Sequence, residues 1–95
     1  MELPLADVKL YREIQGYIER NHDRHPIYNQ MDDLNAVQFI FKSNYVSNHT
    51  FSNMCKYLKI ELSRIIEWQI QPKSNRSLEI IFFVSRSDLP PKNFN

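Results

Sequence analysis

A chain of 95 residues is long enough for one domain with a modest core, and 42% hydrophobic residues with twelve aromatics exclude a disordered chain. A single cysteine, Cys55, excludes an internal disulfide and a cysteine-based zinc site, and no apolar run is long enough to span a bilayer. The net charge of +1 does not by itself indicate a nucleic-acid binder. The first residues are too few and too acidic for a signal peptide, so we expect a reducing, cytoplasmic location.

The first element that the sequence predicts is a helix from Asp7 to about Asn21. Its apolar residues have helical spacing and form one face. Asp7 suits the N-cap or the first turn of this helix. Gly16, the only glycine, lies inside the helix at a cost of about 1 kcal/mol relative to Ala, which indicates a close crossing by another helix. Residues 22–30 are predicted to form a loop, because Pro26 disfavours helix at the residue before it.

The segment from Asp32 to about Asn44 is compatible with two structures. A helix would place Val37 and Phe41 on one face, with an aspartate as its cap. A strand is the competing prediction, because residues 37–41 are rich in strand formers. We expect the helix.

Residues 50–71 contain two apolar patterns separated by a break in phase. Each pattern has helical spacing. The first consists of Met54, Cys55 and Leu58, and the second of Leu62, Ile65 and Trp68. Ile60 lies at the break, where a tight turn would bury it. Two short helices joined by a turn explain this arrangement.

This arrangement resembles the helix-turn-helix of DNA-binding regulators over residues 51–71. In that family the first helix has two adjacent buried residues, one of them small, and Met54 and Cys55 fit these positions. Lys59 stands at the turn, where the family often has glycine. The resemblance implies that residues 61–69 form the recognition helix, which enters the major groove of DNA.

Residues 78–85 form the clearest predicted strand, which is too apolar to be a solvated edge. Its backbone groups need a partner. The candidates are residues 67–71 in a hairpin, the same strand of a second subunit, and residues 37–41. The hairpin, with Lys73 and Arg76 at its tip, resembles the wing of winged-helix proteins.

Together these elements predict a mainly α fold with a β-hairpin, a small winged helix-turn-helix-like domain. We expect residues 1–95 to form a single domain, with a core over about 7–85 and a mobile tail over 86–95.

Positive charge is concentrated on the predicted motif. Residues 51–77 have five Lys or Arg against two Glu, a net charge of +3, whereas residues 1–50 have a net charge of −2. Such asymmetry suits contact with phosphates. The resemblance to helix-turn-helix regulators implies a sequence-specific transcription regulator that binds double-stranded DNA, and we expect no enzymatic activity, cofactor or metal. A homodimer is expected, since two half-sites double the readout. The expected DNA-binding residues are Lys56, Lys59, Glu61, Ser63, Arg64, Glu67, Lys73 and Arg76.

Two apolar residues support a second hypothesis. Leu62 and Ile66 fall on the side of the predicted recognition helix that would face DNA, and exposed apolar groups mark partner sites. The chain could therefore be a non-enzymatic protein-binding adaptor or inhibitor with the same fold.

Overall fold

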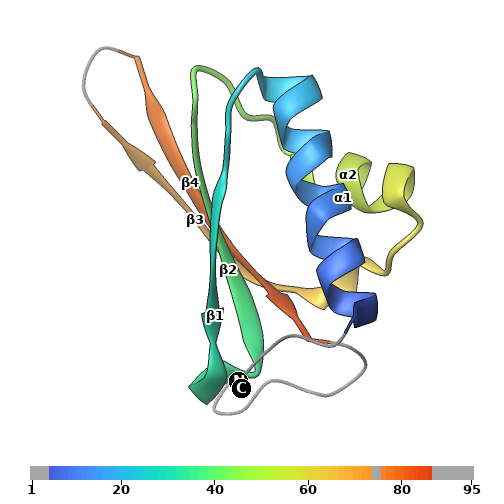
Figure 1. Ribbon diagram of the computed structural model, residues 1–95. Coiled ribbons are helices and arrows are strands. Elements are labelled where there is room, and N and C mark those ends of the chain that lie inside the picture. The colour runs from blue at the N-terminus through green and yellow to red at the C-terminus, as the bar shows by residue number, and fades with distance from the viewer. Residues whose placement is uncertain (1–4, 74–75, 87–95) are drawn as a thin grey trace.

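The computed structural model describes residues 5–73 and 76–86, which fold as two consecutive helix–strand–strand units (Figure 1). In the first unit, α1 (Leu5–His22) is followed by β1 (Ile27–Met31), the 3₁₀ turn η1 (Asp32–Leu34) and β2 (Ala36–Ser43). In the second unit, α2 (Thr50–Leu58) is followed by the 3₁₀ turn η2 (Leu62–Arg64), β3 (Ile65–Pro72) and β4 (Leu78–Ser85).

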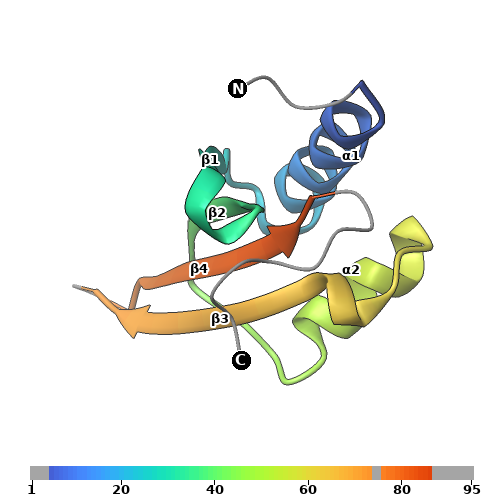
Figure 2. The same cartoon turned by 90° about the horizontal axis from the view of Figure 1, so that it is seen from below.

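The four strands form one antiparallel sheet in the order β1-β2-β4-β3. Each unit therefore contributes one edge strand and one central strand. The two central strands pair with each other from Ala36 opposite Ser85 to Ser43 opposite Leu78. Both helices lie on the same face of the sheet, and no described helix or strand covers the other face, called the open face below (Figures 1 and 2).

The core lies between the two helices and the sheet. Side chains alternate between the faces of a strand, so every second residue of β2 and β4 points to the helices. The aromatic ring of Phe82 is at the centre, with the rings of Phe39, Phe41 and Phe51 at centroid distances between 5.0 and 6.3 Å. The buried hydrophobic cluster consists of Tyr11, Ile14, Ile18, Val37, Phe39, Phe41, Phe51, Met54, Cys55, Ile65, Ile80, Phe82 and Val84.

The helix predicted over residues 7–21 is confirmed as α1, and Asp7 lies in its first turn. The apolar stripe of this helix packs on the sheet through Tyr11, Ile14 and Ile18. Within the part of the chain that the structure describes, no helix combines the length and the apolar character needed to cross a bilayer.

The expected mainly α, winged helix-turn-helix-like fold is wrong, because the domain has two helices and a four-stranded sheet. One source of the error is the segment 32–44, in which residues 36–43 form β2, as the competing prediction held. Val37 and Phe41 are four residues apart, a spacing that places two side chains on one face of either a helix or a strand. Pairing with β1 and β4 on both sides selects the strand.

The second error is the predicted recognition helix, 61–69. This segment forms η2 and then β3, which pairs with β4 from Ile65 opposite Val84 to Pro72 opposite Leu78. The predicted hairpin between residues 67–71 and 78–85 is therefore confirmed, although it excludes the helix. The predicted helix over 61–69 would have nine residues, and so short a helix is marginal alone. As a strand, the same segment pairs with the backbone groups of β4 on the side that does not face β2.

Two smaller predictions are also wrong. Residues 27–30, predicted as the end of a loop, belong to β1, which pairs with β2 and packs Tyr28 on Phe39 with ring centroids 5.3 Å apart. Arg86, placed in the mobile tail, is buried: its backbone N–H donates to the carbonyl of Asn35 at 3.0 Å, and its guanidinium donates to the Asp32 carboxylate at 3.0 Å. The rest of the predicted tail, 87–95, lies outside the described residues.

Candidate functional site

The first half of the predicted motif forms, and its turn has a left-handed residue at the expected position. Helix α2 ends at Leu58, and Lys59 has a φ of 59°. The backbone N–H of Ile60 donates to the carbonyl of Cys55 at 3.0 Å, which closes the helix. Lys56 and Lys59 are both exposed at this end of α2.

Arg64, one of the predicted DNA contacts, joins three elements of the fold through its guanidinium. Its guanidinium donates to the backbone carbonyl of Ser85 and to the Ser85 hydroxyl, the latter at 3.4 Å. It also lies 3.7 Å from the buried carboxylate of Asp7. These contacts connect α1, η2 and β4 and occupy the guanidinium of Arg64 within the fold.

The residues around Arg64 do not lie on one helix, because this segment forms η2 and β3. Glu61 and Ser63 are exposed, and the Ser63 hydroxyl donates to the Glu61 carboxylate at 3.4 Å. Leu62 is exposed in η2, and Ile66 is half-buried at the β-bulge that begins β3. The predicted partner contacts, Leu62 and Ile66, therefore do not share a helix face.

The remaining predicted DNA contacts lie elsewhere. Glu67 is exposed on β3. Lys73 forms an ion pair with Glu79 at 3.6 Å, and Arg76 has a φ of 66° in the turn before β4. The length of β3, roughly 23 Å at about 3.3 Å per residue, separates this turn from η2, which follows the C-terminal end of α2 (Figure 1). The structure thus divides the predicted DNA site between two ends of the molecule.

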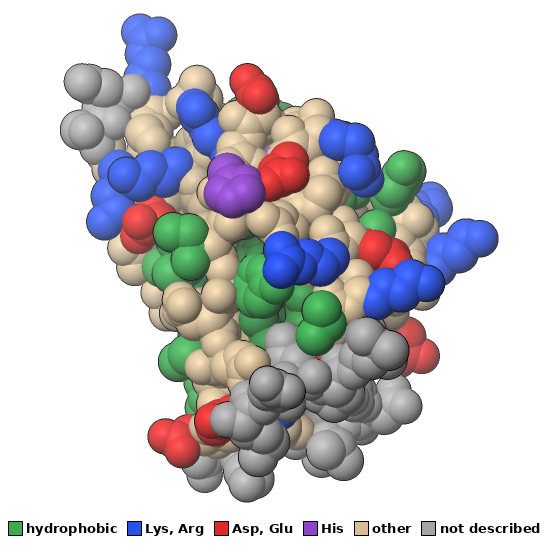
Figure 3. Space-filling view, viewed as in Figure 1, with side chains coloured by type: hydrophobic (Ala, Val, Ile, Leu, Met, Phe, Trp, Pro, Cys, Tyr) green, Lys and Arg blue, Asp and Glu red, His purple; other side chains and the backbone are tan. Residues whose placement is uncertain are grey.

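A different surface brings cations together. A groove of about 600 Å³ lies between the exposed sides of α1 and α2. The α1 residues recur every three or four positions, a spacing that aligns them along one side of a helix. The groove is lined by Lys9, Arg12, Glu13, Gly16, Arg20, Tyr57 and Leu58. Figure 3 shows several Lys and Arg side chains on the side of the molecule where the helices lie.

Gly16 leaves room for Arg20 in this groove. A Cβ atom at position 16 would lie 3.1 Å from a guanidinium nitrogen of Arg20, and among the described residues no atom of α2 lies within 4 Å of it. The predicted close helix crossing at Gly16 is therefore wrong. The missing side chain instead allows the arginine to lie back along its own helix.

Three exposed cations line the groove, and two more are exposed at the C-terminal end of α2, next in sequence to the lining residues Tyr57 and Leu58. This set of five is called the helical basic face below. Within the described part of the chain, none of the five forms an ion pair. Glu13 and Glu61 reduce the net charge of this face to +3. Asp7 and Glu19 are not counted, because Asp7 faces Arg64 and Glu19 pairs with His25. The helical basic face consists of Lys9, Arg12, Arg20, Lys56 and Lys59.

Tyr57 adds an aromatic ring to the wall of the groove. It is 64% exposed, and its ring centroid is 5.4 Å from that of Tyr17. The groove can therefore offer a flat apolar surface next to positive charge. Sequence reasoning missed Tyr57 and the α1 cations because only the packing of α1 beside α2 brings them together. The signal available in the sequence was the three- to four-residue spacing of Lys9, Glu13 and Gly16, which places them along one side of a helix.

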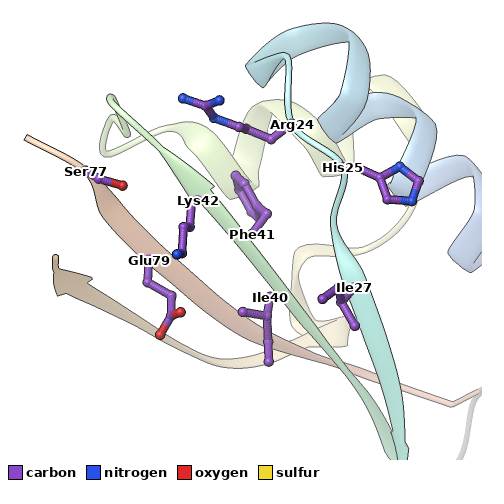
Figure 4. Close-up of a pocket in the computed structure, with 8 residues that line it drawn as sticks. All are labelled: Arg24, His25, Ile27, Ile40, Phe41, Lys42, Ser77 and Glu79. Atoms are coloured by element: carbon purple, nitrogen blue, oxygen red, sulfur yellow. The ribbon is translucent and has the colours of Figure 1, made fainter. Parts of the chain in front are cut away.

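The open face of the sheet carries a second concave region of about 470 Å³ (Figure 4). Ile27 and Ile40 lie side by side there, and the side chains of Arg24 and Lys42 border it. Ile27 is opposite Ile40, which is opposite Ile81, so a row of isoleucines crosses β1, β2 and β4. Ile27 is 62% exposed.

Three titratable side chains are withdrawn from water by the core. Burial raises the pKa of Tyr11, whose hydroxyl donates to the carbonyl of Ser85 at 3.0 Å, and raises the pKa of Cys55. Burial lowers the pKa of His22, whose ring lies 5.1 Å from that of Phe41. Over residues 5–73 and 76–86, no three His, Cys, Asp or Glu side chains gather as metal ligands would.

No family model matches the chain, and neither a curated protein nor a solved structure gives a significant match to it.

Proposed function

We propose that the chain is a nucleic-acid-binding protein that contacts its ligand through the helical basic face. The observation that carries this proposal is the set of five exposed cations without ion pairs on α1 and at the end of α2, three of which line the groove between the two helices. When unpaired Lys and Arg side chains neutralise phosphates, the counterions condensed on the nucleic acid are released, and this release drives association.

Single-stranded nucleic acid suits this groove better than a duplex. Proteins that bind single strands combine a positive groove with aromatic side chains on which bases stack. The exposed ring of Tyr57 supplies such a surface beside Arg20 and Lys9. Sequence-specific reading of a duplex depended on a helix over 61–69, so the proposal does not retain it.

The test is fluorescence anisotropy with a labelled single-stranded oligonucleotide and with a duplex of the same length, at low and at physiological salt. We expect tighter binding of the single strand, with an affinity that falls steeply as salt rises. Five phosphate contacts predict a logarithmic salt slope of up to about −3.5. Replacing Lys9 and Arg20 together by Glu should make this slope shallower by about 1.4, because two phosphate contacts are lost. Tyr57→Ala should weaken single-strand binding without changing the slope.

The hairpin turn provides a matched control. Lys73→Glu with Arg76→Glu makes the same change of charge at the far end of β3 and should leave most of the affinity intact. If this variant loses binding and the α1 variant retains it, the contact surface is the hairpin. Absence of binding to either oligonucleotide at low salt would exclude the function.

A second candidate function is the protein-binding adaptor, which the open face supports. The isoleucine row leaves apolar surface exposed where a solvated face would be mainly polar. A photo-crosslinking amino acid at position 81 would capture such a partner, whereas the same group at position 57 should not. Equal capture at both positions would contradict docking on the open face.

A further inference from the structure

Strand β3 forms one outer edge of the sheet and pairs with β4 on one side only, with no described strand on the other. The open edge of a strand presents unpaired N–H and C=O groups, which are a template for pairing with another chain. Proteins protect such edges with short strands, bulges, prolines or lysines. The other edge strand, β1, has five residues, whereas β3 has eight.

The central part of β3 lacks these protections. Its bulge lies between Ile65 and Glu67, and Pro72 is its last residue. From residue 67 to residue 71 the sequence is Glu-Trp-Gln-Ile-Gln, with one charge, no lysine and no proline. This run is therefore free to accept a further strand.

Two large apolar side chains lie half-exposed along the same run. Trp68 is 48% exposed and Ile70 is 41% exposed. The ring of Trp68 leans on that of Phe51, with centroids 5.0 Å apart, so both β3 side chains belong to the helix-covered face. Apolar surface beside an open edge is the combination that a further strand would cover.

We propose that two copies of the chain associate by antiparallel pairing of β3 with β3, about a two-fold axis at Gln69. This register uses the whole unprotected run. It places Gln69 opposite Gln69 of the second copy, Trp68 opposite Ile70, and Glu67 opposite Gln71. Apolar side chains therefore meet apolar side chains, amides meet amides, and the glutamates of the two copies do not face each other, which favours the pairing.

The pairing has a consequence for the shape of the assembly. In this register the helix-covered faces of both copies lie on the same side of a continuous eight-stranded sheet. The two helical basic faces then also lie on that side. The dimer itself rests on the strand edge and does not depend on nucleic-acid binding.

The test uses the full chain in sedimentation velocity over a broad concentration range. We expect a reversible dimer, and the only tryptophan, Trp68, reports it directly, because dilution should shift its fluorescence to longer wavelength. Gln69→Lys and Gln69→Glu should each weaken the dimer several-fold, since like charges then face each other at the axis. An equimolar mixture of the two variants should restore association.

Asn29→Lys is the matched control, because it puts the same charge on the other edge strand, β1, and should leave the dimer unchanged. Circular dichroism checks that every variant remains folded. A chain that stays monomeric at all concentrations would overturn the proposal. So would a dimer that Asn29→Lys weakens and Gln69→Lys does not, or a mixture that fails to associate better than either variant alone.

Discussion

Trp68 and Phe82 provide a direct stability test of the sheet, because they are opposite each other on β3 and β4 yet differ in burial. Phe82 is fully buried among three other aromatic rings, whereas Trp68 is 48% exposed and contacts Phe51. Replacing a buried Phe or Trp by Ala costs about 3–5 kcal/mol. We therefore expect about 3–5 kcal/mol for Phe82→Ala and about half of that, roughly 1.5–2.5 kcal/mol, for Trp68→Ala.

The measurement is urea unfolding followed by far-ultraviolet circular dichroism, since Trp68→Ala removes the only tryptophan. Two protein concentrations separate the loss of folding stability from any loss of dimer. Domains of this size have total stabilities of about 5–15 kcal/mol, so a cost of about 3–5 kcal/mol removes a large fraction of the total. The Phe82 variant should therefore be much less stable than the Trp68 variant. A Trp68→Ala cost equal to that of Phe82→Ala would place Trp68 in the core, as a helical motif requires, and would refute the sheet register.

Three further predictions concern individual side chains. Burial lowers the pKa of His22 below its unfolded value, so the free energy of unfolding should fall as the pH drops through about 6.5. In unfolding curves at several pH values, His22→Gln should remove this loss, whereas the surface variant His49→Gln should not. Lys59→Gly relieves the left-handed conformation and should add about 0.5–1 kcal/mol, whereas Lys56→Gly inside α2 should cost about 1 kcal/mol. Tyr11→Phe removes a buried hydrogen bond and should cost about 0.5–1.5 kcal/mol in the same urea assay.

The features that were predicted correctly depend on neighbours along the chain. Helix α1, the turn at Lys59 and the hairpin of β3 with β4 are all built from contacts within a few residues or across one short loop. The apolar run 78–85 also indicated a strand with partners, because its backbone groups could not remain unpaired in a buried position.

The features that were missed depend on residues far apart in sequence. The four-residue spacing of Val37 and Phe41 fits a helix and a strand equally, and only pairing with β1 and β4 selects the strand. The helical spacing in 61–69 is overridden in the same way by pairing with β4.

The positions of the charges show the same limit. Sequence alone determined how many cations the chain has and that residues 51–77 are basic. Only the tertiary structure decided which of them are available to a partner. Arg64 lies next to Asp7, 57 positions away in sequence, and Arg86 pairs with Asp32, 54 positions away. The cations of α1 and α2 remain exposed. An ion pair depends on distance in space, and the fold sets that distance for residues remote in the chain.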